Sequence, residues 1–155
     1  MKYQFKYHYP LFDLCYVEED GYIIKIMQDE GEENAAIIAT PIILLAHEEM
    51  MAYLEGKLKQ FSVPYKLIGT PFQLKVLHEL EKIPYGETVS YKSIACKVGN
   101  PKASRAVGGA IHNNPIGIIV PCHRVIGSNQ KLIGYAGGLD MKSKLLDLEK
   151  AKYRI

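Results

Sequence analysis

Two adjacent helix signals in the C-terminal half of the 155-residue chain constrain its fold more than any other feature. Ser90 can cap a helix over residues 91–98, which Gly99 ends. Asn100-Pro101 then provides a cap and a first residue for another helix, which runs to about Ile111. Two short helices across a turn that contains glycine are typical of a helix-turn-helix, which we therefore expect here.

The second of these predicted helices is unusually slim. Gly108 and Gly109 stand in its interior, where glycine disfavours a helix by about 1 kcal/mol relative to alanine. Small residues let a helix backbone approach a partner closely, and Arg105 projects from this one. Two interpretations stay open. The helix enters a DNA groove and Arg105 fills the space of a displaced base, or it packs against another helix and Arg105 is solvated.

Charge is segregated along the chain. No Asp or Glu occurs between Thr88 and Leu139, a stretch that carries the cations Lys92, Lys97, Lys102, Arg105, Arg124 and Lys131. Of the 19 Lys and Arg residues, 13 remain elsewhere against all 17 acidic residues, so the rest of the chain has a formal charge of −4. A basic segment of this kind is typical of a polyanion-binding face, although a solvated surface of six cations explains it as well.

Composition excludes several classes of protein. With 48% hydrophobic and 23% charged residues, the chain predicts a soluble globular protein with one core or two small ones. No apolar run approaches the roughly 18 residues that span a bilayer, and no signal-peptide core opens the chain, so we expect a cytoplasmic protein without membrane partners. The three cysteines show no CxxC spacing, which argues against disulfides and structural zinc. Cys15 is expected to be a small core residue.

The first third of the chain predicts a small α+β domain. Strand-like runs over Leu11–Val17 and Tyr22–Met27 are joined by turn-forming residues at 19–21, which predicts a hairpin. Thr40-Pro41 then opens a helix that runs to Gly56.

The rest of the chain predicts a second domain, so that we expect domains over residues 1–68 and 69–155. Thr70 and Gln73 form a capping box that opens its first helix. An amphipathic helix over about residues 140–152 closes the chain.

A thiol stands beside an imidazole at Cys122 and His123, after the apolar run Ile118–Val120, which predicts a strand. A thiol attacks as thiolate, and a nearby imidazole can make thiolate available at neutral pH. The alternative is an inert core thiol, since free cysteine is among the most buried residue types. Adjacent side chains of an extended segment point to opposite faces, so we expect no direct bond between Cys122 and His123. Glu149 is also ambiguous, because a carboxylate on a terminal helix is more often solvated than catalytic.

Four separate stretches carry a resemblance to one family. They occur in that family's order and are Gly86–Tyr91, Gly99–Gly109, Pro121–Val125 and Tyr135–Leu139. From about Thr70 to Glu149 the chain resembles the O6-alkylguanine-DNA alkyltransferases, also called methylated-DNA–protein-cysteine methyltransferases. The first third matches only in its coarse α+β pattern. The resemblance implies an α+β fold, with a ribonuclease H-like N-terminal domain of a small sheet and helices, and a mostly helical C-terminal domain with the helix-turn-helix.

The resemblance also implies a chemistry. Such a protein takes the alkyl group from O6 of guanine in duplex DNA onto its own cysteine, here Cys122, once and irreversibly, without a cofactor or metal. O4-alkylthymine is a second candidate substrate. His123 is implied to act on Cys122 through an ordered water, with Glu149 orienting the imidazole. Asn114 is implied to hold the active-site backbone and the thiol, and the protein is expected to be a monomer.

A base inside a duplex hides its O6 atom, so the partner implied is double-stranded DNA with the alkylated guanine flipped out. The slim helix is implied to lie in the minor groove, with Arg105 filling the gap. The implied DNA contacts are Lys102, Ala103, Ser104, Arg105, Ala106 and Gly108. Tyr91 is implied to donate to N3 of the guanine. The other implied base contacts are the carbonyls of Cys122 and Val125, the Tyr135 side chain, the Ala136 amide and the loop at Gly137.

The sequence departs from the family pattern in places, and other functions fit parts of it. Ala136 stands where some members have serine, and Gly117 where some have proline. A lesion-binding relative without chemistry would lack the thiol of Cys122. A sequence-reading regulator would need more side chains on its second helix than the glycines leave. A thiol hydrolase would give Arg105 no purpose.

Overall fold

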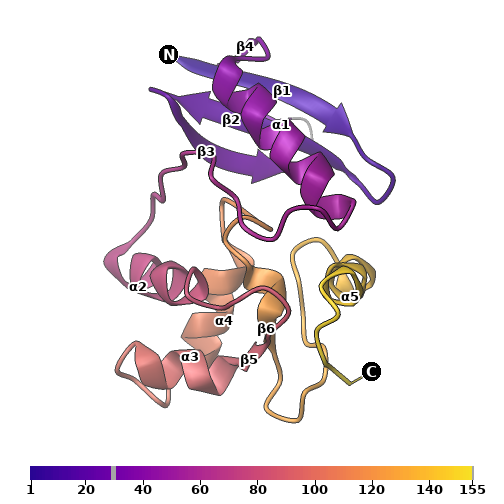
Figure 1. Ribbon diagram of the computed structural model, residues 1–155. Coiled ribbons are helices and arrows are strands. Elements are labelled where there is room, and N and C mark those ends of the chain that lie inside the picture. The colour runs from indigo at the N-terminus through magenta and orange to yellow at the C-terminus, as the bar shows by residue number, and fades with distance from the viewer. Residues whose placement is uncertain (29–30, 155) are drawn as a thin grey trace. The chain divides into compact units, whose positions relative to one another are not determined.

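The computed structural model describes residues 1–28 and 31–154 (Figure 1). The chain divides into two compact units, residues 1–68 and 69–155, each with its own core. Within the described residues the fold is α+β, and none of its helices is long and apolar enough to cross a bilayer.

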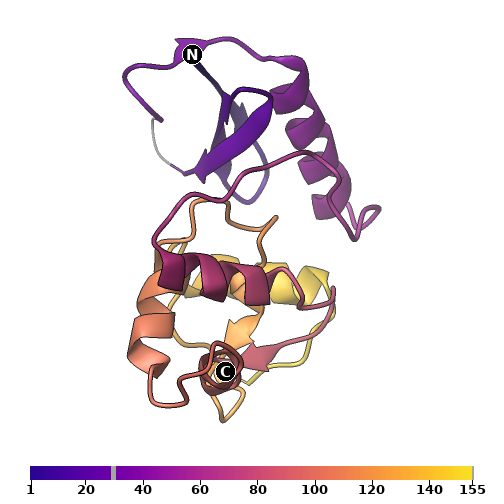
Figure 2. The ribbon, with the colours of Figure 1, turned by 90° about the vertical axis from the view of Figure 1, so that its left-hand side faces the viewer.

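The N-terminal unit is a four-stranded sheet with one helix on it. The strands β1 (Lys2–His8), β2 (Asp13–Glu19) and β3 (Tyr22–Met27) are antiparallel, and the short β4 (Ala36–Ile37) runs parallel to β1. The order across the sheet is β3-β2-β1-β4. The helix α1 (Pro41–Leu54) lies across one face of this sheet (Figure 1, Figure 2).

The predicted hairpin is confirmed, because β2 and β3 pair across Asp20 and Gly21. Both residues have positive φ, of 53° and 85°, which glycine adopts readily and aspartate tolerates in a turn. The first strand of the hairpin starts at Asp13 rather than Leu11, since the Tyr9 amide donates to the Phe12 carbonyl and residues 9–12 form a turn.

The helix that Thr40-Pro41 predicts also forms. The Thr40 hydroxyl accepts from the Ile43 amide at 3.2 Å, and the helix buries Ile43, Ala46, Met50 and Tyr53 against the sheet. It ends at Leu54, two residues before Gly56, which has φ of 76°.

The C-terminal unit is mostly helical. Its elements are α2 (Pro71–Leu80), β5 (Val89–Ser90), α3 (Tyr91–Lys97), α4 (Ser104–His112), the 3-10 turn η1 (Cys122–Arg124), β6 (Val125–Ile126) and α5 (Leu139–Leu148). The helices α2, α3 and α4 pack on one another, and β5 pairs in parallel with β6. This pairing ties the start of α3 to the segment that follows Cys122.

The capping box at the start of α2 is only half formed. The Thr70 hydroxyl accepts from the Gln73 amide at 3.1 Å, as predicted. The Gln73 side chain instead donates to the Asn113 carbonyl at the end of α4, at 3.0 Å. The residue therefore joins two helices rather than closing its own.

The predicted start of α4 was wrong. The Asn100 side chain accepts from the Lys102 amide at 3.2 Å, and its carbonyl accepts from the Ala103 amide at 3.0 Å, so Asn100 and Pro101 form a turn before the helix. The helix begins at Ser104, and no side chain caps it. Asparagine's local bonding to the backbone thus lengthens the connection between α3 and α4.

The apolar run before Cys122 is not a strand, which corrects a second expectation. Ile118 has φ of 73°, and the Val120 end of the run forms an isolated bridge with Gly117 instead of a strand ladder. Cys122 and His123 lie in the 3-10 turn η1, so the strand alternation that we assumed for them does not apply.

The last helix is shorter than predicted. It ends at Leu148, because Lys150 adopts φ of 57° and the Ala151 amide donates to the Leu146 carbonyl, which stops the helix. Glu149 is left as the cap residue, 3% exposed.

Candidate active site

The Cys122 thiol is buried, with 5% of the residue exposed, at the first position of η1. The side chains of Asn114 and Tyr135 hydrogen-bond its sulfur, and the Lys142 ammonium lies near enough to favour a thiolate. Burial nonetheless dominates and raises the pKa of Cys122 above its ordinary value. The thiol is therefore protonated at neutral pH and needs a base before it can attack.

Asn114 holds the segment that leads to the thiol. Its side-chain amide donates to the Val120 carbonyl at 2.9 Å, and its side-chain oxygen accepts from the Ile116 amide at 3.0 Å. One residue thus closes the irregular loop over residues 114–120 and also touches the sulfur of Cys122.

His123 is completely buried, with one nitrogen held by a carboxylate. Its Nε2 lies 2.7 Å from Oε2 of Glu149, so the proton belongs on Nε2 and the lone pair on Nδ1. In the described part of the chain, Nδ1 is a buried side-chain atom without a hydrogen-bond partner. Burial lowers the pKa of His123, while the bond to Glu149 raises it in part. The net result is a neutral imidazole with a free basic nitrogen.

The Glu149 carboxylate connects His123, Arg124 and the Gly86 amide. Its Oε1 accepts from Arg124 Nε at 2.8 Å and from the Gly86 amide at 3.1 Å. Its Oε2 accepts from Arg124 Nη2 at 3.0 Å as well as from His123. The ambiguity of Glu149 is thereby resolved, because its carboxylate is buried against the imidazole.

Arg124 corrects our interpretation of the basic segment. We counted it among the cations of a polyanion-binding face, but it is 7% exposed. Its remaining nitrogen, Nη1, donates to the Ile83 carbonyl at 2.7 Å, and its guanidinium lies 5.7 Å from the ring centre of Tyr85. The cation is part of the site's interior rather than of the surface.

Sequence reasoning missed Lys142, which is also completely buried. Its ammonium donates to the carbonyls of Val125 at 2.6 Å, Ile133 at 3.1 Å and Gly134 at 3.1 Å. Burial lowers the pKa of Lys142 to about 8. The signal was present in the helical spacing, because Lys142 shares the inward face of α5 with Leu145, Leu146 and Glu149.

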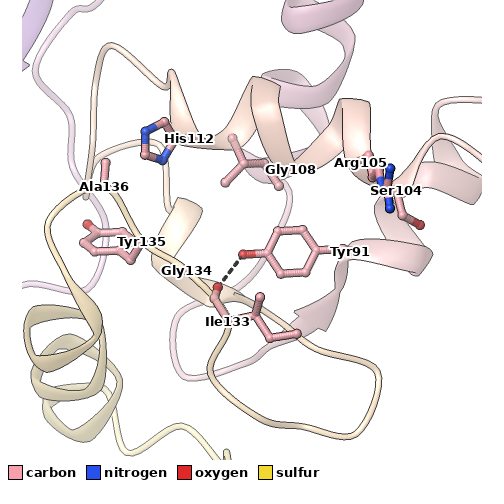
Figure 3. Close-up of a pocket in the computed structure, with 10 residues that line it drawn as sticks. Tyr91, Ser104, Arg105, Gly108, His112, Ile133, Gly134, Tyr135 and Ala136 are labelled. Carbon is pink, nitrogen blue, oxygen red and sulfur yellow. Dashed lines mark hydrogen bonds between the residues drawn. The ribbon is translucent and has the colours of Figure 1, made fainter.

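A pocket of about 360 Å³ is lined in part by Tyr135, which hydrogen-bonds the Cys122 sulfur (Figure 3). It is lined by Tyr91, Ser104, Arg105, Gly108, Ile111, His112, Ile133, Gly134, Tyr135 and Ala136. The Tyr91 hydroxyl donates to the Ile133 carbonyl at 2.8 Å, and burial raises the pKa of Tyr91 to about 12. His112, in the last turn of α4, is a wall residue that sequence reasoning did not identify.

The sequence-predicted residues fall into four sets in the structure. Asn114 hydrogen-bonds Cys122 and Glu149 hydrogen-bonds His123, the next residue in the chain, while Tyr91, Ser104, Arg105, Gly108, Tyr135 and Ala136 line the pocket. Val125 contributes its carbonyl to Lys142. Lys102, Ala103, Ala106 and Gly137 are not among the lining residues.

The slim surface of α4 is not required by packing. A β-carbon built on Gly108 or Gly109 meets no heavy atom within 4 Å, and Arg105 and Ala106 are exposed. Close packing on another helix therefore does not explain these glycines.

Comparison with known proteins decides the family. The family model described as 6-O-methylguanine DNA methyltransferase, DNA binding domain, matches residues 71–151. The constitutive methylated-DNA–protein-cysteine methyltransferase of Bacillus subtilis is 42% identical over 154 residues, which cover 94% of this chain and 93% of that protein. The chain belongs to the methylated-DNA–protein-cysteine methyltransferases.

Other members of the methyltransferase family agree. The protein of that name from Methanosarcina acetivorans is 59% identical over 104 residues, 67% of each chain. The crystal structure of Mycobacterium tuberculosis O6-methylguanine methyltransferase has a TM-score of 0.87 at 39% identity and covers 97% of this chain and 93% of its own. The structure of Mycobacterium tuberculosis OGT in complex with DNA has a TM-score of 0.89 at 40% identity, covering 96% of this chain and 92% of its own.

Proposed function

We propose that this methyltransferase repairs alkylated DNA by moving the alkyl group from O6 of guanine to Sγ of Cys122, once per molecule. The observation that carries the proposal is the buried Cys122 thiol, followed in the chain by His123, a neutral imidazole whose Nε2 is held by Glu149. The names of the relatives, and the neighbouring structure determined with DNA, support the same conclusion.

The reaction begins with removal of the thiol proton. Nδ1 of His123 accepts this proton, through one water, and Glu149 stabilises the imidazolium that forms. The Lys142 ammonium and the side chains of Asn114 and Tyr135 favour the thiolate. The sulfur then bonds to the alkyl carbon, the carbon–O6 bond breaks, and its electron pair passes to the guanine.

The departing guanine is a better leaving group when it receives a hydrogen bond or proton at N3. Tyr91 is suited to this role, because its raised pKa keeps the hydroxyl protonated and the residue lines the pocket. It must exchange its bond to the Ile133 carbonyl for one to the base.

The pocket walls then hold the flipped base. Tyr135 and the Ala136 amide face the ring and O6, and Gly137 lets the loop pass close to the base. The carbonyls of Cys122 and Val125 receive the exocyclic amine. The Val125 carbonyl already accepts from Lys142, and its second lone pair is used for the base.

We assign the DNA contact to α3 and α4, acting as a helix-turn-helix. The exposed glycine-rich face of α4 lies in the minor groove, and Arg105 fills the gap left by the flipped nucleotide. Lys102, Ala103, Ser104, Ala106 and Gly108 make the remaining contacts. A ribonuclease H-like N-terminal domain, a monomeric state, a cytoplasmic location and activity on O4-alkylthymine stay predictions.

Mass analysis tests the reaction directly. The protein is incubated with a duplex that contains O6-methylguanine, and its intact mass and peptide masses are measured. We expect one methyl group per protein, on Cys122, and none in Cys122→Ala. The matched control is Cys96→Ala, at an exposed cysteine of α3, which should react like wild type. Binding to the lesion without a change in mass would contradict the proposal.

A further inference from the structure

Two basic side chains share the single carboxylate of Glu149. Arg124 binds both of its oxygens, at 2.8 Å and 3.0 Å, in the bidentate geometry of a strong ion pair. His123 binds one of the same oxygens at 2.7 Å. The side chains of Glu149 and His123 are fully buried and that of Arg124 is 9% exposed, so solvent does little to weaken these charges.

A buried carboxylate beside an imidazole normally favours the imidazolium, because the opposite charge stabilises it. Here the guanidinium already balances the carboxylate, so an imidazolium would add a second positive charge to the same acid. The protonated ring is therefore disfavoured at rest, although Glu149 still orients it through Nε2. A protonated ring has no lone pair on Nδ1 and cannot accept the proton of Cys122.

We propose that Arg124 is a positioning residue for the transfer reaction, which keeps His123 neutral by occupying the carboxylate of Glu149. This role rests on the proposed function, in which Nδ1 acts as the base. It differs from a structural role, because it makes the charge of Arg124 decide the pH at which the base becomes available.

Other charged and titratable groups also face His123; Lys142 acts in the same sense as Arg124, and Glu149 in the opposite sense. From α5, Lys142 disfavours the imidazolium and Glu149 favours it. Cys122 precedes the ring in η1 and is neutral at rest. From the segment after α2, Tyr85 lies against Arg124 and Glu149, and burial raises the pKa of its phenol, which stays neutral. Glu149 is thus the one acid acting on His123 among the groups that shift its pKa, and Arg124 controls it.

The wild-type protein gives the first test, which does not depend on repair activity. Nitrogen NMR of labelled histidine reports the protonation of both ring nitrogens, with His123 assigned by the loss of its signals in His123→Gln. We expect a neutral ring with the proton on Nε2 at pH 7. A doubly protonated His123 at pH 7 would overturn the proposal while leaving the transfer reaction itself intact.

Charge removal gives the second test. In Arg124→Gln, the pair of His123 and Glu149 should take up one proton at higher pH. Whether that proton sits on the ring or on the carboxylate, Nδ1 becomes protonated, because a carboxylic acid would donate to Nε2. The single-turnover rate falls at low pH, and the midpoint of this acid limb should move up by about 1 to 3 pH units in Arg124→Gln. A shift of this size is typical when one nearby charge opposite to that of the carboxylate is removed.

Arg124→Lys is the matched control, since it keeps the charge and loses the two-pronged geometry. Its acid limb should stay within a few tenths of a pH unit of wild type, even if its melting temperature falls. Equal acid limbs in folded Arg124→Gln and wild type would overturn the proposal. If Arg124→Gln does not fold, Arg124→Lys still tests the proposal. Because lysine keeps the charge, an acid limb shifted by a full pH unit or more in Arg124→Lys would overturn the proposal.

Discussion

Each unit of the molecule contains a histidine in a hydrogen-bonded cluster, and only one of these clusters is suited to chemistry. In the N-terminal unit, His47 Nδ1 lies 2.8 Å from the Tyr9 hydroxyl, which lies 2.7 Å from the Tyr16 hydroxyl. The Tyr7 ring stacks on the imidazole, with centroids 3.7 Å apart. We call these four residues the tyrosine cluster. The thiol cluster of the C-terminal unit is Cys122, His123, Arg124, Lys142 and Glu149.

Burial lowers the pKa of the histidine in both clusters, so a lowered pKa does not distinguish them. The partners do. His47 bonds a phenol whose own pKa is raised by burial, so its hydrogen-bond partner is neutral, although the nearby Glu48 favours an imidazolium in part. His123 bonds a carboxylate and has a thiol as its neighbour in sequence. A buried imidazole becomes a base where one nitrogen is held by an acid and the other is free.

The largest expected effect separates the two histidines. His123→Gln removes the base and should slow methyl transfer by about 10²- to 10⁴-fold, the usual contribution of general-base catalysis. His47→Gln should leave the rate unchanged and lower the free energy of unfolding by about 1 to 2 kcal/mol, through the lost hydrogen bond and ring stacking. Single-turnover rates and urea unfolding measure the two effects. A similar loss of rate in both variants would break the comparison.

The next prediction separates the thiol cluster from the exposed helix α4. Arg105→Ala should slow repair of duplex DNA by roughly 10- to 100-fold, because flipping a base costs a few kcal/mol that the finger offsets. Its reaction with free O6-methylguanine should be unchanged. Lys102→Ala is the matched control, because it removes an exposed cation and should weaken DNA binding in a salt-dependent way alone. Equal losses on both substrates would rule out base flipping by Arg105.

Local signals explain which parts of this molecule sequence reasoning found. Thr40, Thr70 and Ser90 each accept from a backbone amide three residues on, and each helix starts where its cap predicts. The prediction for the start of α4 failed because an asparagine side chain can either cap a helix or close a turn. In this chain Asn100 closes a turn.

The interior of the site depended on contacts that sequence reasoning could not supply. Arg124 was counted as a surface cation and Lys142 was not singled out, since charged residues are rarely buried without a partner. Their partners are Glu149, 25 residues away, and three carbonyls from two other segments. The 3-10 turn at Cys122 likewise lies where these distant elements meet, and the local pattern of apolar residues predicted a strand instead.

Lys142 sharpens the comparison further, because the tyrosine cluster has no charge of this kind. Lys142→Met removes a cation that favours the thiolate, and we expect about tenfold slower transfer, equal to one pH unit in the pKa of Cys122. Lys144→Met, at an exposed position of the same helix, is the control and should leave the rate unchanged. Equal rates in wild type and Lys142→Met would show that this cation does not act on the thiol.

The same variant tests the buried charge through its pH dependence. The pKa of Lys142 is about 8 in the folded protein against an ordinary 10.5, so between these values the unfolded chain binds more protons. The stability of wild type relative to Lys142→Met should therefore rise from pH 8 to 10.5 and level off above it. A flat difference across this window would show that the pKa of Lys142 is not lowered in the folded protein.

The last prediction compares the two clusters after the reaction. A methyl group on Cys122 overpacks a thiol that is 5% exposed and is bonded to two side chains, which should lower the free energy of unfolding by about 1 to 3 kcal/mol. Hydrogen exchange should locate the loss in residues 114–126 and leave the strands around Tyr16 unchanged, because each unit has its own core. Equal melting temperatures before and after methylation would mean that the site relaxes around the methyl group. In that case the irreversibility of the reaction would rest on the stability of the thioether alone. A neutral thioether does not release its methyl group, because the Cys122 thiolate is a poor leaving group.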